Sequence, residues 1–381
     1  MAKLMAEVSV EFGRNIDDYD ALWAWAVDEP GAFWAAVARW AGLTFATPYE
    51  TPLVADVMPG ATWFPGAALN YAAMVFQNRA RDKIALIHQA EDGTVTKMTW
   101  GELEARTAAI AKALSRAGIG QGDRVAGYLP NKLETVAIFL ATVSLGAVWS
   151  LCAPDMGAPT VLERFRQINP KALITASGYA FGGRWHDRQG EITEMLEGLP
   201  SLALWVTLED AQAPARHGLE TLSLDSLPAA AGPLSPVMVP FDHPLWVVYS
   251  SGTTGAPKAI LHGHGGVVLE HLKLTGLHCD VGPDDTLCWY SSTGWIMWNI
   301  HIGGLLRGAT LAIPEGNPNL PDPGRLWRFL EEAGVTAFGA GAAWYHGCMK
   351  AGITPSNIAD LGRVKVLAST GSPLAPEAYA W

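Results

Sequence analysis

Residues 249–258 read Tyr-Ser-Ser-Gly-Thr-Thr-Gly-Ala-Pro-Lys and directly follow the apolar run Leu245-Trp246-Val247-Val248. The segment combines the groups that hold phosphate in proteins. Its glycines allow positive φ, so that backbone N–H groups can turn toward an anion, and its hydroxyl groups and one ammonium group add further donors. We assign phosphate binding to the members of this loop that carry those groups: Ser250, Ser251, Gly252, Thr253, Thr254, Gly255 and Lys258.

The loop differs from a Walker A motif, because the order glycine, four residues, glycine, lysine, serine or threonine is absent. Pro257 prevents a helix from continuing through Lys258, and the apolar residues 259–261 that follow predict a second strand. In a strand-loop-strand hairpin no helix dipole assists, so the hydroxyl groups carry more of the anion binding. The alternative interpretation is an ordinary Gly/Thr turn, which a shorter cluster without the proline and lysine would favour.

Composition places the chain among globular proteins. It has 381 residues, of which 49% are hydrophobic and 17% charged, enough to bury a large core in two or three subdomains. The formal net charge of -11 and the lack of a lysine- and arginine-rich run argue against a nucleic-acid partner. An anionic substrate must therefore be held by a local site.

The four cysteines, at positions 152, 279, 288 and 348, are far apart, and no C-x-x-C pair or secretory leader is apparent. This favours reduced core cysteines and a cytoplasmic protein. His346 and Cys348 lack further ligands and do not predict a metal site. The apolar run 136–152 approaches the length of a membrane span, but Gly146 divides it into a buried helix and a buried strand, so we predict no membrane span.

Strand and helix patterns alternate along most of the chain. Thr99, three residues before Glu102, predicts a capping box at the start of a helix that runs to Arg116. Strands are predicted near residues 84, 124, 147, 172, 245, 286, 310 and 364, with helices between them, which indicates α/β architecture with two doubly wound sheets. We expect an N-terminal helical extension over residues 1–75, a first α/β subdomain over 76–235, and a second over 236–381.

The loop at 249–258 resembles the phosphate loop of the adenylate-forming, AMP-binding superfamily. Two later segments appear in the order that this family shows, namely residues 289–299 and residues 369–374. The tryptophan-rich beginning, the strings 63–66 and 69–72, and the strings 153–157 and 164–168 make the resemblance closer to the acetoacetyl-CoA synthetase family, the short-chain branch related to acetyl-CoA synthetases. The resemblance covers nearly the whole chain.

This resemblance implies site residues beyond the phosphate loop. Gly371, Ser372 and Pro373 would border adenine, and Arg184 would meet a phosphate of CoA. The acyl pocket would be lined by Trp295, Ile296, Met297 and Thr370, although Trp and Met are more often ordinary core residues. His262 and His264 flank the second strand of the hairpin, and we interpret them as loop or core histidines.

The resemblance implies an ATP-dependent acid–thiol ligase with ATP, Mg²⁺ and CoA, and acetoacetate as the carboxylate. The chain contains no G-x-S-x-G or S-x-x-K motif, which disfavours serine-based acyl transfer. The family's adenylation lysine, metal-holding glutamate and ribose-binding aspartate would come after Trp381, so we assign no catalytic or metal-binding residue. We therefore expect residues 1–381 to be a truncated N-terminal portion with little ligase activity alone.

Two other interpretations remain open. The chain could be a non-catalytic module that binds a nucleotide or CoA, or it could belong to an acyl-CoA synthetase for another short or branched carboxylic acid. Sequence alone does not decide the acyl group, because the size of its pocket depends on how Trp295, Met297 and other residues meet.

Overall fold

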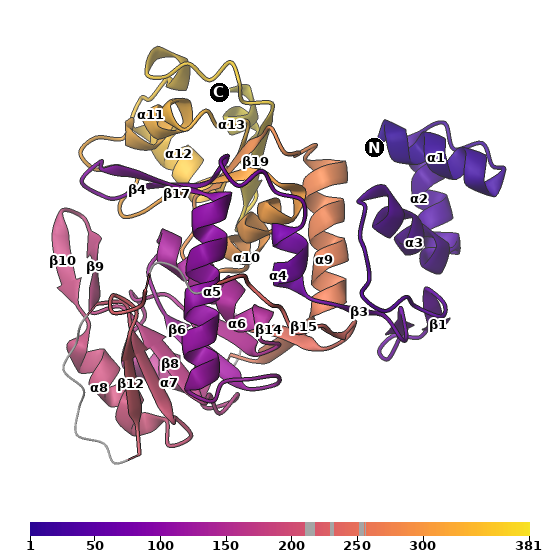
Figure 1. The fold of residues 1–381 in the computed structure, drawn as a ribbon. Helices are drawn as coiled ribbons and strands as arrows, with labels where there is room; N and C mark the ends of the chain where they lie inside the picture. Colours follow the sequence, from indigo (N-terminus) through magenta and orange to yellow (C-terminus); the bar gives the residue numbers. More distant parts are fainter. Residues whose placement is uncertain (210–217, 229–231, 251–254, 256) are drawn as a thin grey trace.

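The computed structural model describes residues 1–209, 218–228, 232–250, 255 and 257–381. The predicted phosphate-binding residues Ser251, Gly252, Thr253 and Thr254 lie outside this described part. Two large sheets with flanking helices make up the α/β body, and a group of helices from the N-terminus lies beside it (Figure 1). The predicted fold class, α/β with two mainly parallel sheets, is confirmed.

The strands of the first large sheet are β12 (Glu220–Ser223), β11 (Leu204–Thr207), β8 (Ala172–Thr175), β6 (Arg124–Tyr128), β7 (Val148–Cys152), β14 (Pro244–Tyr249) and β15 (Ala259–Gly263), in that spatial order. The strands of the second are β19 (Val366–Thr370), β18 (Ala337–Gly341), β16 (Thr286–Trp289), β17 (Thr310–Pro314), β4 (Ile84–Gln89) and β5 (Val95–Thr99). Three small antiparallel pairs are formed by β1 (Leu53–Ala55) with β2 (Thr62–Trp63), β3 (Ala68–Leu69) with β13 (Val239–Pro240), and β9 (Gly178–Phe181) with β10 (Arg184–Asp187).

The α-helices are α1 (Ala2–Phe12), α2 (Tyr19–Asp28), α3 (Pro30–Trp40), α4 (Tyr71–Phe76), α5 (Trp100–Arg116), α6 (Leu133–Ser144), α7 (Ala158–Phe165), α8 (Gln189–Gly198), α9 (His264–Leu272), α10 (Ile296–Ile302), α11 (Arg325–Glu332), α12 (Ala342–Lys350) and α13 (Pro376–Ala380). Shorter turns of other helix types are the π-helix Lys273–His278 and the 3₁₀ segments Gly303–Arg307 and Pro355–Asn357.

Each large sheet is parallel except for one antiparallel strand at an edge. In the first sheet β15 runs antiparallel to β14, and in the second β5 runs antiparallel to β4. Residues 76–235 supply β4 and β5 to the second sheet, and residues 236–381 supply β14 and β15 to the first. The predicted subdomain ranges therefore each contribute strands to both sheets, and the division of the chain at 235 stays a prediction.

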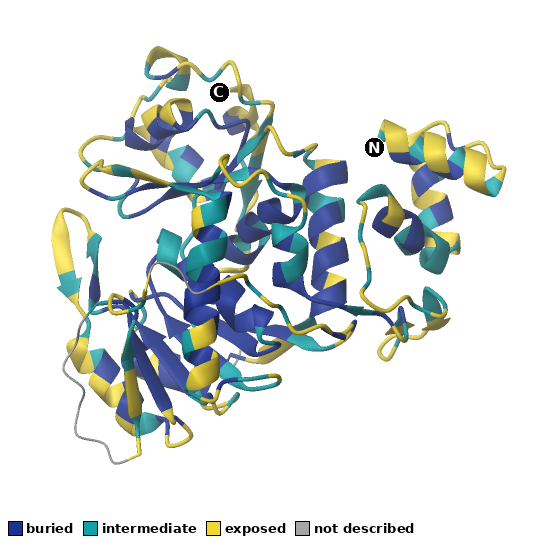
Figure 2. Cartoon of the chain, viewed as in Figure 1, coloured by how far each residue is buried: buried dark blue, intermediate teal, exposed yellow. Residues whose placement is uncertain are grey.

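Local signals placed several elements correctly. Helix α5 begins with the predicted capping box, in which Thr99 Oγ1 accepts from the Glu102 N–H and the Glu102 carboxylate accepts from the Thr99 N–H. The apolar run 136–152 divides at Gly146, whose φ of 69° ends α6 before β7 begins. Helix α6 is buried from Thr135 to Ser144, and Figure 2 shows the buried residues concentrated in the sheets and this helix.

The tryptophan-rich stretch at residues 19–40 forms two helices, α2 and α3. Asp18 caps α2 by accepting from the Ala21 N–H, and Pro30 begins α3 at a position where its missing N–H costs nothing. Among the described residues, no helix is long and apolar enough to cross a membrane.

Candidate active site

The base of the predicted phosphate loop is a hairpin, as its sequence indicates. Strands β14 and β15 pair antiparallel with Tyr249 opposite Ala259. Beyond that pair, the Ser250 N–H donates to the Lys258 carbonyl at 3.1 Å, and the Lys258 N–H donates to Ser250 Oγ at 3.2 Å. The strand-loop-strand prediction is confirmed, and Lys258 is held at the mouth of the loop.

The last residue of β14 is anchored to the neighbouring strand. Ser150 Oγ in β7 lies 3.2 Å from the Tyr249 hydroxyl and 3.0 Å from the Val247 carbonyl. Burial raises the pKa of Tyr249, which keeps its hydroxyl neutral. The Arg164 guanidinium lies 5.9 Å from the centre of the Tyr249 ring and brings a second cation close to the start of the loop.

The two histidines of the hairpin are structural, as interpreted from the sequence. His262 Nδ1 accepts from the Trp246 indole N–H at 2.9 Å, and His264 Nδ1 accepts from the Tyr71 N–H at 3.1 Å. Both donors can only donate, so each Nδ1 must be unprotonated. Burial lowers the pKa of His262, and burial with the nearby His243 lowers the pKa of His264 to about 3.

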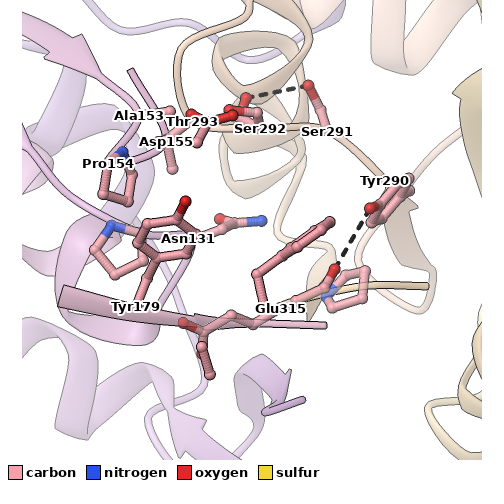
Figure 3. A pocket seen from close by; sticks show the side chains of 15 residues that line it. Asn131, Ala153, Pro154, Asp155, Tyr179, Tyr290, Ser291, Ser292, Thr293 and Glu315 are labelled. Atoms are coloured by element: carbon pink, nitrogen blue, oxygen red, sulfur yellow. Dashed lines mark hydrogen bonds between the residues drawn. The ribbon is translucent and has the colours of Figure 1, made fainter. Parts of the chain in front are cut away.

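A cavity of about 430 Å³ lies where the carboxyl ends of strands from both sheets meet (Figure 3). Its lining comes from the segments after β6, β7, β16 and β17 and from strand β9: Pro130, Asn131, Ala153, Pro154, Asp155, Tyr179, Ala180, Phe181, Tyr290, Ser291, Ser292, Thr293, Pro314, Glu315 and Gly316. Crevices at this end of parallel strands are the usual ligand sites of such sheets. Strand β14 neighbours β7, so Ser250, which directly follows β14, lies at the same end of the first sheet.

The cavity wall contains two polar groups with unused hydrogen-bonding capacity among the described residues. Asn131 Oδ1 accepts from the Trp298 indole at 3.0 Å, while the Asn131 amide nitrogen is buried without a partner. Glu315 Oε2 lies 3.0 Å from His88 Nε2, while Glu315 Oε1 is buried without a partner. The lining includes the carboxylates of Asp155 and Glu315 and no Lys, Arg or His. It therefore suits a neutral ligand with amide-like groups better than a phosphate.

The other predicted site residues lie on the same side of the two sheets. Gly371, Ser372 and Pro373 are exposed and directly follow β19, two strands away from β16 in the second sheet. Gly371 has a φ of 89°, which favours glycine at this turn. Arg184 is exposed at the start of β10, and its hairpin partner β9 supplies part of the cavity wall.

The predicted acyl-pocket residues do not line this cavity. Trp295 and Ile296 are 60% and 42% exposed, and Met297 and Thr370 are half-buried. The Trp295 N–H donates to the Ser292 carbonyl at 3.2 Å, which joins the start of α10 to a residue of the cavity lining. Their assignment to an acyl pocket stays a prediction.

Sequence reasoning missed Asn131, Tyr179 and Glu315 as site residues. A signal for Asn131 and Glu315 was present, since both come shortly after predicted strands, where parallel sheets place their ligands. No local signal marks Tyr179, because it reaches the cavity from a small hairpin. As for a metal, the described residues contain no group of three or more His, Cys, Asp or Glu side chains placed to hold one.

Comparison with known families gives the class of protein to which this α/β fold belongs. A family described as "AMP-binding enzyme" matches residues 75–381, so the chain belongs to the AMP-binding enzyme family. A second family, "Acetyl-coenzyme A synthetase N-terminus", matches residues 19–75.

Within this family, the chain is similar to proteins named acetoacetyl-CoA synthetase. The chain is 44% identical to the solved structure of an acetoacetyl-CoA synthetase from Streptomyces lividans, with a TM-score of 0.94. It is 38% identical to the acetoacetyl-coenzyme A synthetase of Rhizobium meliloti (strain 1021) and 36% identical to the acetoacetyl-CoA synthetase of Danio rerio. These matches cover 98–100% of this chain but only 58–59% of the relatives' own length.

Proposed function

We propose that these residues belong to an ATP-dependent acid–thiol ligase that converts acetoacetate, ATP and CoA into acetoacetyl-CoA, AMP and pyrophosphate. The observation that carries the proposal is the hairpin β14–β15, which joins Ser250 to Lys258 just after β14, the neighbour of the strand β7 whose following segment lines the cavity. Membership of the AMP-binding family and the names of the relatives support the same reaction.

The reaction has two displacement steps. An oxygen of the carboxylate attacks the α-phosphorus of ATP, and pyrophosphate leaves as the acyl-adenylate forms. The thiol of CoA then attacks the acyl carbon and loses its proton, and AMP leaves. Neither step needs a nucleophile from the protein, so positioning and charge neutralisation are the main contributions of the site.

We assign the parts of the substrates to different segments. The phosphates of ATP contact the loop that ends at Lys258, and adenine lies over residues 371–373. The acyl group contacts Trp295, Ile296, Met297 and Thr370. The uncharged, amide-containing arm of CoA enters the cavity, where Asn131 offers a donor and Glu315 an acceptor, and Arg184 faces a CoA phosphate.

Mg²⁺ is proposed only as the ion that accompanies ATP. The described side chains do not form a metal site, so no step is assigned to a protein-bound metal. We also propose a cytoplasmic location, which the four free cysteines support.

The test is a substrate panel on the protein that contains these residues. Pyrophosphate release is measured with ATP and CoA and with acetoacetate, acetate, butyrate or a branched acid as the carboxylate. We expect the highest kcat/KM with acetoacetate, and a higher value with another acid would contradict the substrate assignment. Binding of ATP without pyrophosphate release from any acid would favour a nucleotide-binding module instead.

The chain spans about 59% of the length of its relatives, so activity is proposed for the whole protein to which it corresponds. For the 381-residue chain alone, we expect ATP binding with little turnover. Pyrophosphate release at the rate of ordinary synthetases, about 10 per second, would contradict that expectation.

A further inference from the structure

We propose that Gln167, just after α7, is a positioning residue that fixes Lys258 for contact with the phosphates of a nucleotide. This inference rests on the proposed function, because it assumes that Lys258 binds phosphate. Gln167 itself touches no substrate and acts only through the backbone on each side of Lys258.

The Gln167 side-chain amide contacts both residues that flank Lys258. Its nitrogen donates to the Pro257 carbonyl at 2.8 Å, and its oxygen accepts from the Ala259 N–H at 3.2 Å. The second N–H of the amide donates to the Glu163 carbonyl in α7 at 3.0 Å. Both donors and the acceptor are therefore used, and only one orientation of the amide satisfies all three contacts.

The Gln167 side-chain amide makes the hydrogen bonds that a neighbouring strand would make with the edge strand β15. β15 is the last strand of its sheet, so the outward-facing N–H and C=O groups at its beginning have no neighbouring strand. In a parallel ladder, a neighbouring residue donates to the carbonyl before a given residue and accepts from the N–H after it. The Gln167 amide makes those two contacts around Lys258.

The backbone around Lys258 is consequently hydrogen-bonded on both edges of the strand. On the inner side, its own N–H and C=O are bonded to Ser250 in the opposite limb of the hairpin. On the outer side, Gln167 holds the carbonyl before it and the N–H after it. Four hydrogen bonds thus fix the backbone from which the ammonium group extends, which reduces the entropy lost when it meets a phosphate.

Gln167 is not required to hold α7 in place. The helix is packed by Val161, Leu162 and Phe165, which are buried, whereas Gln167 is exposed. Its removal should therefore leave the fold intact and loosen the mouth of the loop.

The experiment compares Gln167→Met with Gln77→Met in the 381-residue chain. Gln77 is a matched control, because it donates one hydrogen bond to Thr44 at 3.2 Å beside α4, far along the chain from the loop. Calorimetry with ATP and with AMP separates phosphate contacts from adenine contacts. We expect Gln167→Met to weaken ATP binding about five-fold and AMP binding less than two-fold, as the loss of two partly exposed hydrogen bonds implies. The control should change neither.

A second readout needs no ligand. We expect amide hydrogen exchange at Ala259 to accelerate about ten-fold in Gln167→Met, while the Val247 amide keeps its protection. Unchanged ATP affinity in Gln167→Met, or an equal loss for ATP and AMP, would overturn the positioning role. If the unmodified chain binds ATP no better than AMP, the proposed function fails instead, and the exchange result still decides whether Gln167 orders the hairpin.

Discussion

Each large sheet has one antiparallel hairpin at an edge. The two hairpins differ in the source of the anion that their region binds. In the second sheet, β4 and β5 are joined by a tight turn in which the Ala90 N–H donates to the Thr94 carbonyl at 2.9 Å. In the first sheet, β14 and β15 are joined by the long loop that ends at Lys258. The loop of the β14–β15 hairpin is proposed to bind an external anion, whereas the turn of the β4–β5 hairpin contains an anion of its own.

That anion is the carboxylate of Glu91. It accepts from the N–H groups of Gly182 and Gly183 at 2.7 and 2.9 Å and from the Asn317 N–H at 2.7 Å. Burial alone would raise the pKa of Glu91, but these donors and the nearby Arg325 outweigh it, so its pKa lies below the usual value. Consecutive glycines with φ of 66° and 73° present the first two donors. The same chemistry predicted for the phosphate loop thus operates inside the molecule.

The largest expected effect of a single substitution comes from emptying the internal site. Glu91→Ala removes the acceptor for three N–H groups, each costing about 1 kcal/mol when left unsatisfied, so the free energy of unfolding should fall by about 3 kcal/mol. Urea unfolding measures it. Glu91→Gln, which keeps one acceptor oxygen, should lose less unfolding free energy. If Glu91→Ala unfolded at the same urea concentration as the unmodified chain, the Glu91 carboxylate would not be a stabilising internal anion.

Acid should destabilise the first hairpin before the second. The pKa values of His264 and His271 are lowered to about 3 by burial, so both stay neutral in the folded state while the unfolded chain takes up protons below about pH 6.5. Stability is therefore complete above pH 6.5 and is lost as pH falls toward 3, by up to about 2 kcal/mol per histidine at pH 5.

Urea unfolding at pH 7 and pH 5 measures the total loss of unfolding free energy. Amide hydrogen exchange shows which strands lose protection. We expect amides of β15, which leads directly into His264, to lose more protection than those of β4. Equal losses of amide protection in β15 and β4 would show that acid does not distinguish the two hairpins.

Lys258→Met tests the external site. Removing the only ammonium group of the loop should weaken ATP binding about ten-fold and leave the free energy of unfolding unchanged, because no side-chain contact of Lys258 stabilises the described part of the fold. Calorimetry with ATP is the measurement, with Lys350→Met, a surface lysine of α12, as the control. A loss confined to stability would mean that Lys258 serves the hairpin and not a ligand.

Tyr249→Phe should have the smallest effect. It removes one hydroxyl that lies 3.2 Å from Ser150 Oγ, and Ser150 keeps its bond to Val247, so unfolding should change by less than about 1 kcal/mol. ATP affinity should stay within two-fold. A larger loss of affinity would indicate that the Tyr249 hydroxyl itself faces the nucleotide.

Local signals in the sequence predicted the elements better than their assembly. The Thr99–Glu102 capping box and the division at Gly146 depend on neighbours in the chain, so both could be recognised. The membership of β4 in the second sheet depends on pairing Leu86 with Leu311, which no local pattern contains. The strand-loop-strand geometry of the β14–β15 hairpin was predicted because its sequence signals are contiguous, and its role in phosphate binding stays a prediction. The cavity was missed because Asn131 and Glu315 meet only after both sheets have formed.

The pairing of the early strand β4 with the late strand β17 sets an order for folding during synthesis. β4 leaves the ribosome long before β17, its partner in the second sheet, whereas the strands of the first sheet all lie within residues 124–263. The second sheet cannot be completed from a contiguous piece of chain, so a nascent chain must keep one edge of the apolar strand β4 unpaired for most of its translation. Such long-range pairing slows folding and exposes edges to other chains, which makes this body a natural client for chaperones.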